Sequence, residues 1–178
     1  MAPLSLNNNN EKIELTIIRN LFFNEDYTRK VLPFLNPIYF SQRNERELYI
    51  ELEKFIHKYK NLPTKEAILI ELNNRKDINE EEHKNIKELI NTISYEEVDL
   101  QWLLDTTERF CKDRAVHNAV LDGIKILDGK DNKRTQEAIP SILADALAVS
   151  FDNHIGHDYI GDADNRFDWY HTKEKKYK

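Results

Sequence analysis

One short segment near the C-terminus carries the donor atoms that a divalent metal ion would need. His154, His157 and Asp158 form the pattern H-x-x-H-D, and imidazole nitrogens and carboxylate oxygens are both suitable zinc ligands. A catalytic metal also needs a further ligand held by the scaffold, and the sequence nominates none. We therefore favour the alternative, a polar linker whose imidazoles bond to backbone or water, because short motifs often match by chance.

No other segment carries a recognisable catalytic signature. The sequence lacks the phosphate loop G-x-x-x-x-G-K-[ST], the dinucleotide pattern G-x-G-x-x-G and the zinc-protease pattern H-E-x-x-H. Gly129-Lys130 lacks both the upstream glycine and the following Ser or Thr, so we interpret it as a turn between helices. Cys111 lies on an apolar helical stripe with no histidine indicated beside it, which predicts a core residue rather than a nucleophile. We expect no catalytic residue, bound metal or cofactor in this chain.

Composition favours a helical protein without disulfides. Of 178 residues, 40% are apolar and only 4 are Gly and 5 Pro. A single cysteine excludes an internal disulfide framework and suits a reducing compartment. No apolar run approaches the roughly 18 residues of a membrane span, and no signal peptide is evident, so we expect a cytoplasmic protein that is neither secreted nor membrane-bound. With 32 acidic against 26 basic residues, the net charge of −6 argues against nucleic acid as the partner of the whole surface.

Hydrophobic periodicity predicts an all-α fold that begins with a small helical head. Residues 1–10 are polar and end in four asparagines, so we expect a flexible arm there. Residues 11–97 are expected to form the head, with five short helices and helix-start signals at Asn24, Thr64 and Asn79.

A long antiparallel helical hairpin is predicted over residues 98–152. Its first helix should run from Asp99 to about Leu127, a rod of about 40–45 Å. After a turn, the second helix should return as far as Phe151. We expect four apolar side chains to pack the hairpin: Leu103, Phe110, Ile142 and Leu147.

A detached linker helix and a basic tail are predicted over residues 153–178. Four residues fall on one helical face and are predicted to dock on another subunit: Ile160, Ala163, Phe167 and Tyr170. Gly156 and Gly161 separate this segment from the preceding helix, and its polar face is rich in aspartate. We favour a docking helix that buries its apolar face in another domain or subunit. The alternative is a helix that folds back on the hairpin as ordinary core.

Three stretches of the sequence resemble a known family. They are LTIIRNLFFNEDYTRKVLPFLNPIYF (15–40), QWLLDTTERFCKDRAVHNA (101–119) and AIPSILADALAVSFDNHIGHDYIGDADNRFDWY (138–170). Together with the order of head, hairpin and linker, they are similar to the N-terminal region of ring-shaped DnaB-like replicative DNA helicases, and in particular to the primase-helicase subunit of T-even-type bacteriophages. The resemblance covers about residues 13–175.

The resemblance implies a non-catalytic part of a replication machine. Proteins of this family are hexameric, ATP-dependent helicases, and ATP and Mg bind in a RecA-like ATPase domain. This sequence stops at Lys178, about where that domain should begin, so we expect the domain to be absent. The chain would then be the assembly and partner-binding (collar) domain, acting in DNA replication in the cytoplasm of a phage-infected bacterium.

The resemblance also implies the partners. They would be further copies of the chain or parent helicase subunits, together with primase and the helicase loader, while DNA would be bound only weakly or through the missing domain. An alternative is a standalone helical adaptor or regulator of a helicase or primosome. A less favoured one is a small metal-dependent enzyme that uses His154, His157 and Asp158.

Overall fold

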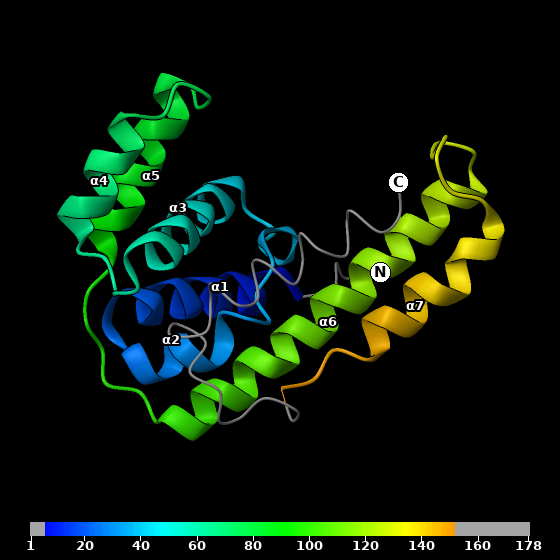
Figure 1. Cartoon of the computed structure of the whole chain (residues 1–178), viewed down its shortest axis with the longest axis horizontal. Helices are drawn as coiled ribbons and strands as arrows, with labels where there is room; N and C mark the ends of the chain where they lie inside the picture. The colour runs from blue at the N-terminus through cyan, green and yellow to red at the C-terminus, as the bar shows by residue number, and fades with distance from the viewer. Residues whose placement is uncertain (1–5, 152–178) are drawn as a thin grey trace.

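The structure is a computed structural model, and it describes residues 6–151 (Figure 1). All regular elements within this range are helical, so the predicted all-α fold is confirmed. The elements follow one another as α1 (Leu6–Phe23), α2 (Glu25–Val31), the 3-10 helix η1 (Pro37–Tyr39), α3 (Arg43–Tyr59), α4 (Lys65–Asn73), α5 (Glu80–Thr92), α6 (Leu100–Leu127), the 3-10 helix η2 (Gln136–Ala138) and α7 (Ile139–Leu147).

Three helices of the head begin at the residues that the sequence predicts. The side chains of Asn24, Thr64 and Asn79 each accept a hydrogen bond from a backbone N–H in the first turn, at 2.9, 3.1 and 2.8 Å. Asn79 also forms a capping box with Glu82, whose carboxylate accepts from the Asn79 backbone N–H. Each such cap typically contributes about 1 kcal/mol, which explains why these short helices have well-defined starts.

Helix α1 begins earlier than expected. It starts at Leu6 and carries the four asparagines, so the prediction of an arm over residues 1–10 is wrong for residues 6–10. Asparagine costs no more than about 0.7 kcal/mol per residue relative to alanine in a helix. The helix is already nucleated by the fully buried Ile17, Ile18 and Leu21, and extending a formed helix is much easier than starting one.

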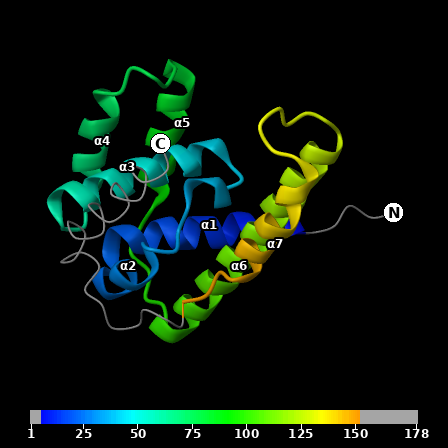
Figure 2. The same cartoon turned by 45° about the vertical axis from the view of Figure 1, so that its right-hand side comes forward.

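An aromatic cluster occupies the centre of the head. The Phe40 ring stacks on Tyr49 of α3 at a centroid distance of 4.8 Å and lies 6.1 Å from the ring of Phe110 on α6. All three rings are almost completely buried. On the far side of α3, helices α4 and α5 pair with each other and complete the head (Figure 2). We call α1–α5 with η1 the head.

Helix α6 belongs to two parts of the molecule. Its N-terminal half packs against α1 and α2, its middle contacts η1, and its C-terminal half pairs with α7. Two side chains of α6 also hold η1, because Arg114 donates to the Tyr39 carbonyl at 2.7 Å and Asn118 donates to the Ile38 carbonyl at 3.0 Å. With 28 residues, α6 is about 42 Å long. Head and hairpin thus share one continuous helix.

The hairpin of α6 and α7 points away from the head (Figures 1 and 2). Small residues on α6 bring the two helices together, with Ala115, Ala119 and Gly123 buried beneath α7. Helix α7 ends at Leu147, four residues before the predicted end at Phe151. None of the helices within residues 6–151 is long and apolar enough to cross a membrane.

Replacing Gly123 by alanine should stabilise the hairpin. A Cβ atom at this position would lie 3.6 Å from Cγ2 of Ile139, which is ordinary van der Waals contact. Because glycine inside a helix costs about 0.8–1.0 kcal/mol relative to alanine, we expect Gly123→Ala to raise the free energy of unfolding by roughly 0.5–1 kcal/mol. Thermal unfolding followed by circular dichroism measures this change.

The matched control is Gly129, which also has room for a Cβ atom but adopts φ +67° in the turn after α6. Gly129→Ala should lower the stability by about 1 kcal/mol, because a side chain is strained in the left-handed region. Equal effects of the two substitutions would contradict this account of the hairpin.

Candidate functional site

Two of the four predicted hairpin-packing residues serve the junction with the head instead. Leu103 and Phe110 are only 1% and 3% exposed, and they belong to the common core. Leu103 faces α1, and Phe110 faces the aromatic cluster around Phe40. They therefore connect α6 to the head rather than to α7.

The α7 side of the prediction is partly wrong. Ile142 packs against the core, but Leu147 is 73% exposed and is not among the side chains that pack the core within residues 6–151. The preceding residue, Ala146, is the one that points inward, with 8% exposure. Adjacent helical residues are separated by about 100°, so with Ala146 facing α6 the side chain of Leu147 has to turn away.

An exposed apolar surface runs along the outer half of α6. It consists of four side chains that are 43–60% exposed, Val120, Leu121, Ile124 and Leu127, and we call it the outer apolar face. Positions 120, 124 and 127 are spaced by four and three residues, so they lie on one side of the helix. Each of them directly follows a residue of the buried strip, Ala119, Gly123 and Ile126, so the exposed side lies about 100° around the helix from that strip.

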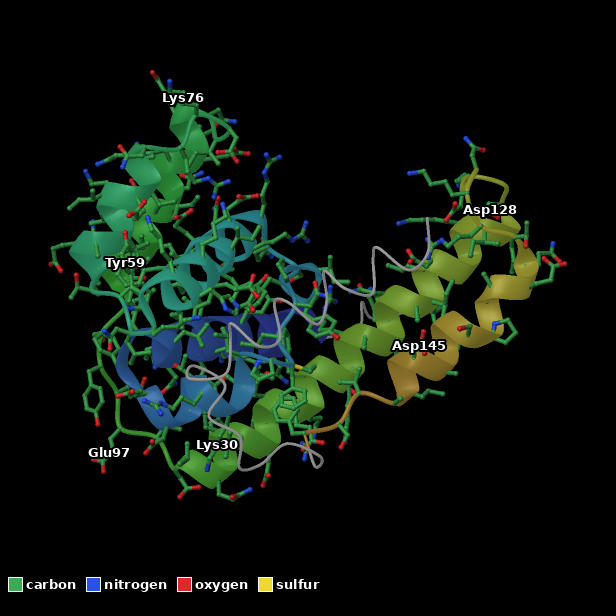
Figure 3. All side chains as sticks on the ribbon, viewed as in Figure 1. Lys30, Tyr59, Lys76, Glu97, Asp128 and Asp145 are labelled. Carbon is green, nitrogen blue, oxygen red and sulfur yellow. The ribbon has the colours of Figure 1, made fainter. Side chains whose placement is uncertain are left out.

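The outer apolar face extends to the tip of the hairpin. Leu127 is followed by Asp128, which lies at the tip, well away from head residues such as Lys30 and Tyr59 (Figure 3). Large exposed apolar residues are unremarkable singly, but a contiguous row of them indicates an interaction surface.

The charged side chains near this face are paired with one another. Asp122 accepts from Arg134 at 3.1 Å and lies 3.8 Å from the Lys125 ammonium group, while Arg134 also pairs with Asp131 at 2.7 Å. These charges stay at the rim and leave the four apolar side chains uncovered. An apolar strip with a polar rim is the usual arrangement of a protein–protein interface.

The sequence pattern does not predict the outer apolar face. Periodicity reports that a helix is apolar, but α6 is apolar on two sides and only one of them has a partner within residues 6–151. A count of apolar residues around the whole helix, rather than along one stripe, is the signal that could have revealed the second side.

The remaining candidates from the sequence are Cys111 and the possible metal-binding and linker residues. Cys111 is fully buried, and burial raises the pKa of its thiol to about 12, so it stays protonated near neutral pH and the predicted core role is confirmed. In the described part of the chain, no group of three or more His, Cys, Asp or Glu residues could hold a metal ion. The proposed metal ligands and linker residues lie outside the described residues and stay predictions: His154, His157, Asp158, Ile160, Ala163, Phe167 and Tyr170.

The fold is an all-α head with a protruding hairpin, and the sequence of the chain is similar to that of a replicative helicase. The relative is the DnaB-like replicative helicase of Enterobacteria phage T4, which is 30% identical over 168 residues, covering 90% of this chain. The match covers 35% of the relative, so the chain spans about a third of that protein's length. No family model matches the chain. The predicted resemblance to DnaB-like helicases is confirmed.

Proposed function

We propose that this chain is the assembly and partner-binding (collar) domain of a ring-shaped, hexameric, ATP-dependent replicative helicase that acts in phage DNA replication. The similarity to the T4 helicase over nine-tenths of the chain supports a role connected with a replication helicase. The sequence holds no phosphate loop, so this part of the protein is expected to hydrolyse no ATP by itself.

The outer apolar face is the observation that carries the proposal. Its four side chains stand on a two-helix arm that is itself held firmly by the head through Phe110 and Arg114. An apolar face on a rigid arm is suited to pack against the same face of another subunit, because burying apolar surface stabilises association by about 25 cal/mol per Å². Helix pairing of this kind is self-complementary in a two-fold interface.

The finer assignments are part of the same proposal. Primase and the helicase loader would bind to surfaces of the assembled collar, and DNA would be contacted mainly by other parts of the parent protein. Ile160, Ala163, Phe167 and Tyr170 would dock on a neighbouring subunit, as their spacing on one face suggests. The cytoplasm of an infected host is the compartment that such a role requires.

Introducing a charge into the outer apolar face tests the proposal. The wild-type chain should show a molecular mass that rises with concentration in sedimentation velocity, as subunits pair through their hairpins. Ile124→Glu places a carboxylate in the middle of the face and should weaken this association at least tenfold, about 1.4 kcal/mol, because the charge must be desolvated on pairing.

The matched control is Ile70→Glu, since Ile70 is 61% exposed on α4 of the head, away from the hairpin. This variant carries the same substitution at a similarly exposed site and should associate like the wild type. A wild-type chain that stays monomeric at every concentration would contradict the proposal, and so would equal weakening by both substitutions.

A further inference from the structure

A second surface, a cleft between α1 and α6, opens at the edge of the core and is separate from the outer apolar face. It has a volume of about 370 Å³ and lies along the N-terminal halves of the two helices. Its floor includes Ile13 and Ile17 from α1 and Leu103 from α6. Trp102 stands at its edge and is 53% exposed. The cleft thus offers an apolar floor next to a large exposed aromatic ring.

The charge of the cleft differs from that of the chain as a whole. Lys12 and Arg109 line it, and none of its lining residues is acidic, although the chain has 32 acidic residues and a net charge of −6. Both cations are exposed, and neither makes an ion pair with any residue in the 6–151 range. An apolar floor with two unpaired cations favours a segment that has apolar side chains on one side and carboxylates beside them.

One segment of this chain has that chemistry. Residues 158–170 read DYIGDADNRFDWY, with four aspartates against one arginine. Their apolar residues Ile160, Ala163, Phe167 and Tyr170 are spaced as on one side of a helix. Such a segment could place aromatic rings on the cleft floor and aspartates against Lys12 and Arg109.

The described chain ends close enough for this segment to reach the cleft. Phe151 stacks on Phe34 at a centroid distance of 4.4 Å, and its backbone N–H donates to the Glu108 carboxylate at 3.3 Å. Glu108 and the cleft residue Arg109 are neighbours on α6, about 100° apart around the helix. The seven residues from 152 to 158 can span up to about 25 Å, which exceeds the path around one helix of about 10–12 Å diameter.

We propose that the cleft between α1 and α6 is a docking site for residues 158–170 of the same chain. The cleft and the linker segment would then form an intramolecular contact that competes with docking of this segment on another subunit. The inference depends on the cleft, its charge and the position of Phe151, and it stands whether or not the hairpin mediates self-association.

Disulfide trapping in the full chain tests the proposal. Thr106→Cys places a thiol in the cleft, and Ala163→Cys places its partner in the linker segment. A disulfide requires Cα atoms within about 7 Å. Mild oxidation should therefore rapidly give an intramolecular disulfide, which a non-reducing gel shows as a cross-linked monomer. Cys111 can remain, because it is buried and its thiol has a raised pKa.

Two controls separate docking from random collision. In the first control, Ala163→Cys is combined with Asn91→Cys on the exposed surface of α5 instead of with Thr106→Cys. This pair should form a disulfide at least tenfold more slowly. Adding Lys12→Glu and Arg109→Glu should slow trapping by a similar factor, whereas Lys76→Glu with Lys87→Glu, the same change of charge at exposed positions elsewhere, should leave the rate unchanged.

Each other result overturns the proposal. Equal rates of disulfide formation for Thr106→Cys and Asn91→Cys would show that the segment does not occupy the cleft. An unchanged rate in the variant with Lys12→Glu and Arg109→Glu would show that these two cations do not hold the segment. A cross-linked dimer would place the segment in the cleft of a second copy. Repeating the experiment with Ile124→Glu keeps the chain monomeric, so failure here is distinguishable from failure of hairpin-mediated assembly.

Discussion

Phe110→Ala is expected to lower the free energy of unfolding by about 3–5 kcal/mol, the range for a buried phenylalanine replaced by alanine. Phe110 is 3% exposed, and its ring closes the aromatic cluster of Phe40 and Tyr49, which joins α6 to the head. The loss should lower the melting temperature by roughly 6–20 °C, since each kcal/mol corresponds to about 2–4 °C in a protein of this size. Thermal unfolding followed by circular dichroism measures it.

Leu147→Ala is the control for this effect. Leu147 is also a large apolar residue of the hairpin, but it is 73% exposed, so its removal should change stability by no more than about 0.5 kcal/mol. A large loss for Leu147→Ala, or a small one for Phe110→Ala, would show that the core of this molecule lies between α6 and α7 and not between α6 and the head.

Arg75→Met is expected to cost about 3–5 kcal/mol, as when one partner of a buried ion pair is removed. The Arg75 guanidinium, 11% exposed, lies 2.7 Å from the Glu47 carboxylate and 3.7 Å from that of Glu51, which is 8% exposed. It also pairs with Asp77, whose pKa it holds at about 2 by hydrogen bonding. Without the cation, two carboxylates of α3 are left together in a largely buried place, and the contact between α3 and the segment after α4 is lost.

Neutralising those carboxylates should restore most of the stability. We expect Arg75→Met combined with Glu47→Gln and Glu51→Gln to recover more than half of the loss, because no unpaired charge is then buried. Chemical denaturation of the wild type, the single variant and the triple variant provides the comparison. If the triple variant is no more stable than Arg75→Met, lost packing of the arginine side chain explains the effect instead.

Local features of this molecule could be predicted from sequence, and features that depend on distant residues could not. The caps at Asn24, Thr64 and Asn79 were predicted because each cap involves residues only three positions apart. Helix α6 was predicted for the same reason, since its pattern is continuous. The wrong assignment of Leu147 arose because periodicity shows which side of a helix is apolar but not whether another element covers it.

The two candidate surfaces illustrate the same limit. The outer apolar face becomes evident only when α7 is seen to cover the neighbouring strip of α6 and to leave these side chains exposed. The cleft requires Lys12 on α1 and Arg109 on α6 to come together although they are almost a hundred positions apart. The spacing of residues along the sequence predicts neither surface, because both follow from the way in which the helices pack.

The continuity of α6 through head and hairpin has a mechanical consequence. From Phe110 in the head to Leu127 at the tip the helix extends about 26 Å, so a tilt of about 5° at its base would displace the tip by about 2 Å. In a closed ring of identical subunits, the angle between neighbours must add up to a full circle. The aromatic packing around Phe110 therefore limits how far the hairpin can tilt, and in the proposed assembly it would determine how accurately the hairpin is oriented toward a neighbouring subunit.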